Sequence, residues 1–318
     1  IGEMAAAGAC GFKFSTFGTD PKRFPRIPAD LLARCFGAVR ETGLIAGVHN
    51  EDDEMVRARL AQVTEAGITD WRAHGLSRPP LTETLAMAQI YETAAGTGCA
   101  AHVVHCSVAR GYALCASYRQ QGFETTAEAC IHYLVLDEEH DVARLGGRAK
   151  INPPIRPRAQ VEGLWHHLAA GNVSVVSTDH VSWSLTRKSG PDMLKNASGA
   201  PSLEVIYPLF LTELGRRNLS WTHAARLLAE NPARLFRLTS RKGGLAAGRD
   251  ADITVARRED WIYDPKASGH AFEDWSPYEG RTLDWRIAET WLRGERIFAD
   301  GAILAKPGHG RFVKPEQP

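Results

Sequence analysis

The chain has 318 residues, of which 44% are hydrophobic, and a net charge of +1 at neutral pH. This length supplies enough apolar material for one large core, or for a large domain and a smaller one. The basic residues are scattered and balanced by acidic ones, so we expect no nucleic-acid partner. No segment approaches the roughly 18 consecutive apolar residues of a membrane helix, so we expect no membrane partner.

Six cysteines occur, and none forms a Cys-x-x-Cys pair. Several lie in apolar runs, where a thiol behaves as a small hydrophobic group. In a chain of this length that pattern favours reduced, buried cysteines and a cytoplasmic location.

Residues 1–9 lack the basic head and long apolar stretch of a secretory signal. The chain has no initiator Met and opens on a segment that resembles the end of a helix, so we expect further sequence before Ile1.

Between residues 10 and 180, short apolar runs alternate with longer amphipathic segments. The predicted strands are residues 10–16, 44–49, 100–105, a segment within 123–136, and 173–178. The predicted helices are residues 29–41, 53–65, 82–95, 109–121 and 161–169. Alternation of strand and helix predicts a parallel sheet built from βαβ units. A complete eight-stranded barrel typically needs about 250 residues, so three of its units are absent if these five strands belong to one.

After residue 180 the pattern changes. Residues 182–201 are predicted as a loop, and residues 204–214 and 221–235 as helices. From residue 243 onward the apolar runs are short, at 251–255, 287–292 and 296–299, and Gly294 and Gly301 indicate hairpin turns. We therefore predict a partial βα barrel over residues 1–240 and a small β module with a tail over residues 241–318.

Four residues suited to a metal site lie at or near the ends of apolar runs, namely Lys13, His49, His105 and Asp179. In a parallel βα array the strand ends meet at one face, where active sites are built. Imidazoles and carboxylates suit Zn²⁺ and its neighbours. A desolvated lysine becomes neutral more easily and can add CO₂ to form a carbamate. Each residue alone has an ordinary structural alternative, but together they indicate a hydrolytic metal site with Asp179 as proton acceptor.

Several segments, in the same order along the chain, resemble those of the cyclic amidohydrolases, which include hydantoinase, dihydropyrimidinase, allantoinase and dihydroorotase. These segments are residues 11–14, 48–51, 77–79, 103–107, 151–156, 177–180, 198–204, 243–252 and 276–280. The resemblance covers nearly the whole chain. It implies an α/β fold, a (β/α)8 TIM-barrel-type metal hydrolase that lacks its first strands here and carries a small C-terminal β module.

The same resemblance implies a ligand set and a substrate class. It implies two divalent metal ions, zinc by preference, bridged by a carboxylated Lys13. The implied metal ligands are Lys13, His49, His105 and Asp179, with Asp179 also the catalytic residue, and the implied substrate-binding residues are Asn152, Ser198 and Gly199. The substrate would be a small cyclic amide or ureide, and the protein a homodimer or homotetramer.

Two features depart from the family pattern. The His-x-His pair of the first family strand is absent and would precede Ile1. Hydantoinases also place a tyrosine five residues after the lysine, where this chain has Gly18. We expect a metal-dependent hydrolase that opens cyclic amides, hydantoinase- or dihydropyrimidinase-like, with allantoinase or dihydroorotase as the alternative. A non-catalytic dihydropyrimidinase-like scaffold is the alternative from another class, although the retained ligand residues argue against it.

Overall fold

The structure is a computed structural model that describes residues 1–20, 22, 24–268 and 273–316. Packing divides the chain into two compact units, one formed by Ile1–Ala200 and one that begins at Pro201. Across the residues described, no helix combines the length and the apolar character needed to cross a bilayer.

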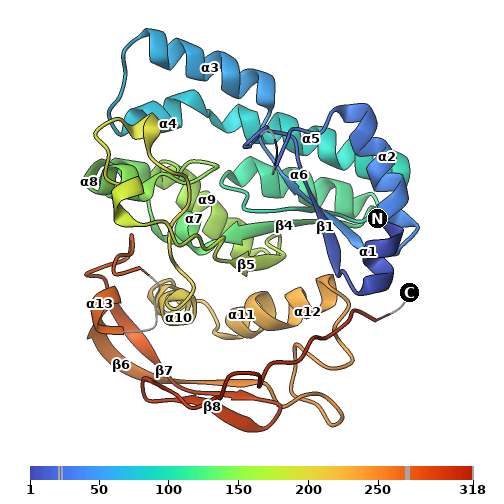
Figure 1. Cartoon of the computed structure of the whole chain (residues 1–318), viewed down its shortest axis with the longest axis vertical. Helices are drawn as coiled ribbons and strands as arrows, with labels where there is room; N and C mark the ends of the chain where they lie inside the picture. Colours follow the sequence, from blue (N-terminus) through green and yellow to red (C-terminus); the bar gives the residue numbers. More distant parts are fainter. Residues whose placement is uncertain (21, 23, 269–272, 317–318) are drawn as a thin grey trace. The chain divides into compact units, whose positions relative to one another are not determined.

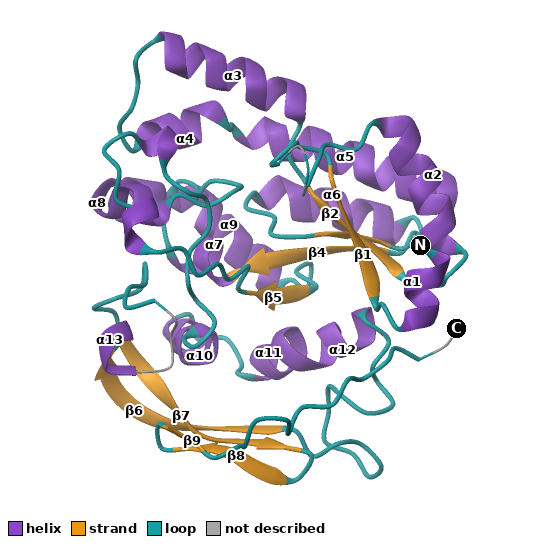
Figure 2. Ribbon diagram, viewed as in Figure 1, coloured by secondary structure: helices purple, strands orange, loops and turns teal. Residues whose placement is uncertain are grey.

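The first unit contains one parallel sheet, whose five strands follow one another in chain order (Figure 2). The strands are β1 (Gly11–Ser15), β2 (Ile45–His49), β3 (Ala101–Val103), β4 (Thr125–Cys130) and β5 (Val175–Ser177). A sheet that keeps the chain order winds in one direction, as in a βα barrel, whereas a doubly wound sheet reverses its order. The five predicted strands and their parallel pairing are confirmed.

The connecting helices of this unit pack side by side along the sheet (Figure 1). The long helices are α2 (Ala29–Arg40), α3 (Asp53–Glu65), α5 (Pro80–Thr97), α6 (Ala109–Gln120) and α9 (Arg158–Ala169). Helix α2 packs on α5, α5 on α6, and α6 on α9, so these helices form a continuous layer. Helix α5 begins before the predicted residue 82, because proline is favoured at the first helical position, where its missing N–H costs no bond.

Shorter helical segments connect these elements. They are α1 (Gly2–Ala7), α4 (Arg72–Ser77), α7 (Ile131–Val135), the π-helix η1 (Glu138–Val142), α8 (Ala143–Leu145) and the 3-10 helices η2 (Gly146–Ala149), η3 (Leu185–Arg187) and η4 (Met193–Lys195). The predicted loop 182–201 therefore includes two short helical turns. Helix α7 was not predicted, because all of its residues are buried and leave no polar period to detect.

The second unit combines helices with an antiparallel sheet. The sheet has the order β6 (Ile253–Ile262), β7 (Thr282–Leu292), β8 (Glu295–Ala299) and β9 (Ala302–Ile303), and α13 (Pro265–Ser268) lies between β6 and β7 in the chain. Helix α10 (Ile206–Arg216) packs on β7. The predicted hairpin turns are confirmed, since Gly294 and Gly301 join consecutive strands with φ of 80° and 86°. Packing groups residues 201–240 with this sheet, and the predicted boundary at 240/241 stays a prediction.

The helix predicted over residues 221–235 is interrupted. It consists of α11 (Thr222–Ala225), the π-helix η5 (Arg226–Glu230) and α12 (Asn231–Leu235). Pro232 has no N–H to donate, and a proline ring crowds the carbonyl four residues before it. Regular α-helical bonding therefore cannot run through this turn, and the π-helix accommodates the break. The prediction of one continuous α-helix is wrong.

Phe36 connects α2 to the strand that carries Lys13. Its side chain is fully buried, and its ring centroid lies 6.0 Å from that of Phe14 in β1. We expect Phe36→Ala to lower the free energy of unfolding by about 3–5 kcal/mol, because it leaves a cavity in the core. The control Leu31→Ala, at a position 42% exposed on the same helix, should change it by less than about 0.5 kcal/mol in denaturant unfolding. Equal losses would contradict this packing.

Candidate active site

The four predicted metal-site residues come from four parallel strands and lie near the same edge of the sheet. Lys13 lies inside β1, and His49 is the last residue of β2. His105 and Asp179 lie just beyond the ends of β3 and β5. Since parallel strands direct their carboxyl ends to one edge, the fold places all four at the edge where βα proteins build their sites.

The two histidines are in direct contact. His49 Nδ1 lies 3.0 Å from His105 Nε2, and the rings meet edge to face with centroids 4.6 Å apart. Both side chains are buried. Burial, together with the neighbouring His49 and Lys13, lowers the pKa of His105 well below its ordinary value. His105 is therefore a neutral imidazole, the form that binds metal ions.

Lys13 and Asp179 are exposed at this edge and influence each other electrostatically. Desolvation lowers the pKa of Lys13, and the charges of Asp179 and Glu128 oppose that shift. Desolvation likewise raises the pKa of Asp179, and Lys13 opposes it. The mutual effect places the amine and the carboxylate within electrostatic range of each other.

The candidate ligands fit part of a metal centre. Within the described part of the chain, no group of three or more His, Cys, Asp or Glu side chains forms a metal-binding arrangement. The two ring nitrogens of His49 and His105 nevertheless converge, and only one proton can lie between them. Neutral imidazole pairs flanked by a carboxylate are a donor set that zinc prefers. These residues therefore fit one side of a metal centre.

Backbone strain coincides with two of the four residues. His105 and Asp179 have φ of 41° and 42°, and they are the positive-φ residues other than glycine among the described residues of the first unit. Such conformations cost on the order of 1–3 kcal/mol each and persist where the surroundings impose them. The His105 amide donates to Glu128 Oε1 at 3.1 Å. His180, next to Asp179, forms a parallel bridge with Ala200.

A buried carboxylate orients His49. Glu51 Oε2 accepts hydrogen bonds from His49 Nε2 at 2.8 Å and from Arg78 Nη1 at 2.5 Å. Burial alone would raise the pKa of Glu51, but Arg78 and His49 outweigh it and hold that pKa well below its ordinary value. Because Nε2 is bound to an ionised carboxylate, Nδ1 is the nitrogen that faces His105. Glu51 thus sets the orientation of the ring, as carboxylates behind metal-binding histidines do.

A second buried carboxylate joins the segments that follow both histidines. Glu83 on α5 accepts from the Ser107 amide at 2.9 Å, from Asn50 Nδ2 at 3.3 Å and from Arg156 Nη2 at 2.7 Å. Arg156 Nη1 also donates to the Arg78 carbonyl at 2.5 Å. One carboxylate and one guanidinium therefore hold the chain beyond β2 and beyond β3 together.

The three predicted substrate-binding residues lie together. Ser198 Oγ donates to Asn152 Oδ1 at 3.2 Å, and both side chains are partly exposed. Gly199 has φ of 109°, and a Cβ atom there would lie 2.6 Å from Val181 Cγ2. Glycine is therefore required at this position. These residues are continuous with the segment after Asp179 through the bridge between His180 and Ala200.

The carbonyl groups on both sides of Asn152 are held by buried side chains. His74 Nε2 lies 2.8 Å from the Ile151 carbonyl oxygen, and Tyr133 Oη donates to the Pro153 carbonyl at 2.6 Å. Burial lowers the pKa of His74 well below its ordinary value, so the ring is neutral and Nε2 donates. The backbone at Asn152 is thus fixed independently of the Asn152 side chain.

Glu128 is a site residue that the sequence pattern did not single out. Its Oε2 lies 3.6 Å from His102 Nε2, and its Oε1 accepts from the His105 amide. The signal available was a carboxylate in the middle of the otherwise buried strand β4, where charged residues are rare unless paired. Lys150 and Lys188 were also missed, because a lysine in a polar loop is usually exposed to solvent.

The sequence of this chain is similar to those of known enzymes. Residues 116–298 match the amidohydrolase family. An allantoinase from Rubrobacter xylanophilus is 35% identical over 99% of this chain and 69% of its own length. A D-phenylhydantoinase from Escherichia coli is 32% identical over 90% of this chain and 63% of its own length.

A solved structure shows the same fold. L-hydantoinase (dihydropyrimidinase) from Arthrobacter aurescens has a TM-score of 0.95 with this chain at 28% identity, over 98% of this chain and 70% of that one. This likeness confirms the predicted barrel-type fold with a small C-terminal sheet. Together with the match over residues 116–298, it shows that the chain belongs to the amidohydrolase family.

Proposed function

We propose that this chain carries one side of the catalytic centre of a metal-dependent hydrolase that opens cyclic amides or ureides. The observation that carries the proposal is the convergence of His49 Nδ1 and His105 Nε2, 3.0 Å apart, at the edge where Lys13 and Asp179 lie. The relatives named allantoinase and D-phenylhydantoinase support the substrate class.

Lys13, His49, His105 and Asp179 would hold divalent metal ions, with zinc favoured by the ligand types. Lys13 would bridge two ions after its neutral amine adds to CO₂, which forms an N–C bond and releases one proton. The lowered pKa of Lys13 favours the neutral amine. When bound, the ions would polarise the substrate carbonyl and make water more acidic.

Asp179 would carry the proton of hydrolysis. The oxygen of water bonds to the ring carbonyl carbon, the ring C–N bond breaks, and the nitrogen takes up a proton. Asp179 would accept that proton from the water and release it to the leaving nitrogen. Its raised pKa suits this exchange, since desolvation makes the carboxylate a better base. Asn152 and Ser198 would orient the imide or ureide edge of the ring.

Gly18 favours one member of this substrate class. Its amide donates to Asp53 Oδ1 at 3.0 Å, and a Cβ atom there would lie 3.0 Å from Arg57 Nη2. Arg57 is paired with Asp53 at 2.6 Å. A tyrosine at this position, as in hydantoinases, would require the Arg57 side chain to shift. We therefore propose allantoin as the preferred substrate, ahead of hydantoin, dihydrouracil and dihydroorotate.

The natural full-length protein should hydrolyse allantoin faster than the other three rings at equal concentration. Chromatography of the ring-opened products measures this. Removal of metal by a chelator should abolish turnover, and added Zn²⁺ should restore it, because the carbonyl is no longer polarised without the ion. A metal-loaded protein that opens none of the four rings would overturn the proposed function. A protein that binds no metal would favour the non-catalytic scaffold.

Glu51→Gln should weaken metal binding by about 10–100-fold, because an amide oxygen holds the His49 N–H less strongly than a carboxylate does. Competition with a chromophoric chelator measures the affinity, and near-UV circular dichroism checks the fold. Glu54→Gln is the matched control, since the Glu54 side chain is 81% exposed. Equal affinities for both variants would refute the orienting role of Glu51.

Asp179→Asn should retain metal but lose about 10²–10⁴-fold in kcat, because an amide cannot accept the proton. The imidazoles and Lys13 remain to hold the ion. Asp70→Asn serves as the control, since Asp70 pairs only at the surface with Arg72. Near-native kcat in the Asp179 variant would show that another group moves the proton.

A further inference from the structure

Two lysines in the first unit are buried, and both amines bind backbone carbonyls. Lys188 is fully buried, and its Nζ donates to the carbonyls of Lys150, Ala197 and Gly199, each at 2.7 Å. Lys150 Nζ donates to the carbonyls of Leu194 and Asn196. Among the described residues, neither amine lies within ion-pair distance of a carboxylate. The two amines therefore form hydrogen bonds with the backbone of residues 194–199 and, in the part of the chain described, no ion pair with an acidic side chain.

The number of bonds identifies the charged form of Lys188. Three carbonyl acceptors at 2.7 Å use all three donors of an ammonium group, whereas a neutral amine has only two. Burial, with the like charge of Lys150, lowers the pKa of Lys188 to about 7, and the carbonyl oxygens favour the protonated state. A buried cation is costly to maintain unless hydrogen bonds compensate for its lost hydration. The hydrogen bonds from Lys188 to three backbone carbonyls supply that compensation.

That backbone belongs to the two proposed substrate loops. Ala197 and Gly199 flank Ser198, and Lys150 precedes Asn152 by two residues. The Gly199 amide also donates to the Lys150 carbonyl at 2.9 Å. The Lys188 amine is therefore one of the groups that join the segment before Asn152 to the segment around Ser198.

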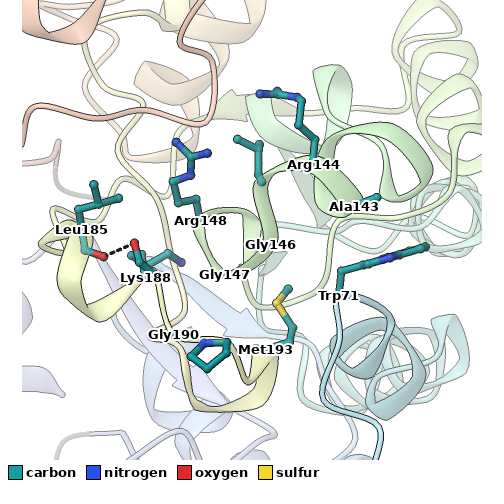
Figure 3. Close-up of a pocket in the computed structure, with 13 residues that line it drawn as sticks. Trp71, Ala143, Arg144, Gly146, Gly147, Arg148, Leu185, Lys188, Gly190 and Met193 are labelled. Atoms are coloured by element: carbon teal, nitrogen blue, oxygen red, sulfur yellow. Dashed lines mark hydrogen bonds between the residues drawn. The ribbon is translucent and has the colours of Figure 1, made fainter.

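The loop that carries Lys188 borders a pocket of about 460 Å³, which residues from 185–193 and 143–148 line together. The Lys188 amide donates to the Leu185 carbonyl at its edge (Figure 3). Other hydrogen bonds also attach the loop, among them Met193 N to the Thr69 carbonyl at 2.8 Å and Ser198 Oγ to Asn152 Oδ1 at 3.2 Å. The two buried amines add five hydrogen bonds to backbone carbonyls.

We propose that Lys188 is a positioning residue whose buried ammonium holds Ser198 beside Asn152 and so sets the substrate-binding geometry. This inference rests on the proposed function. Lys188 lies outside the ligand set, so its loss should change substrate binding more than the chemical step. The residue acts through the two loops and touches no reacting atom.

The test compares Lys188→Met with Lys195→Met in the natural full-length protein loaded with zinc. Lys195 lies on the same loop, with its side chain 84% exposed. Hydrogen exchange of residues 194–200 should be at least about tenfold faster in Lys188→Met, which corresponds to about 1.4 kcal/mol, and unchanged in Lys195→Met. KM for allantoin, or for whichever ring the wild type opens, should rise about tenfold in Lys188→Met, with kcat changed much less and zinc content unchanged.

The outcomes separate this inference from the proposed function. If the wild type opens no ring, the proposed function fails, and hydrogen exchange still decides whether Lys188 orders the loops. If the wild type is active and Lys188→Met keeps native KM and native exchange, the inference is overturned. A fall in kcat at constant KM would also overturn it. If Lys188→Met cannot be purified, Lys188→Gln, which keeps two donors, should show intermediate exchange and KM, and native values in that variant would contradict the proposal.

Discussion

The buried ion pair between Glu83 and Arg156 is the interaction on which the candidate site depends. Its atoms are 2.7 Å apart, and both side chains are almost fully buried. Burial of two charges costs several kcal/mol per ion, and only close pairing with further hydrogen bonds offsets that cost. Ser107, Asn50 and the Arg78 carbonyl supply those bonds. Since these groups follow different strands, one pair fixes the ends of β2 and β3 relative to each other.

The hydrogen bonds around Glu83 and Arg156 explain how the strained backbone at the site is held in place. His105 lies between β3 and Ser107, whose amide is bound by Glu83, and its own amide is bound by Glu128. The φ of 41° at His105 is therefore imposed from both sides. A protein without chemistry at this edge would gain on the order of 1–3 kcal/mol by relaxing each such residue. The strain at His105 and Asp179 is compatible with the role proposed for this edge.

The sequence predicted the five parallel strands, and it placed the four candidate ligands at or near strand ends. Local sequence patterns show where the strands of a βα array end, so apolar runs and residue type were enough to single out His49, His105 and Asp179 as candidates. The contacts that orient these side chains could not be predicted from such patterns. Arg78 and Arg156 belong to loops far from the histidines in sequence, and whether a guanidinium is buried depends on tertiary neighbours that no local period encodes. The break in residues 221–235 shows the same limit, since the apolar pattern continued through Pro232.

Three lysines in this unit illustrate why residue type does not define a role. Desolvation lowers the pKa of all three, and it lowers that of Lys150 to about 8 and that of Lys188 to about 7. The amines of Lys150 and Lys188 donate to backbone carbonyls, and both side chains are buried. Neither amine is therefore available to react with CO₂ or to bind near a metal ion. Lys13 is exposed, beside the Phe24 ring at 5.7 Å and within range of Asp179 and Glu128. Access to solvent and the nearby Asp179, more than a lowered pKa, support the proposal that Lys13 serves a metal centre.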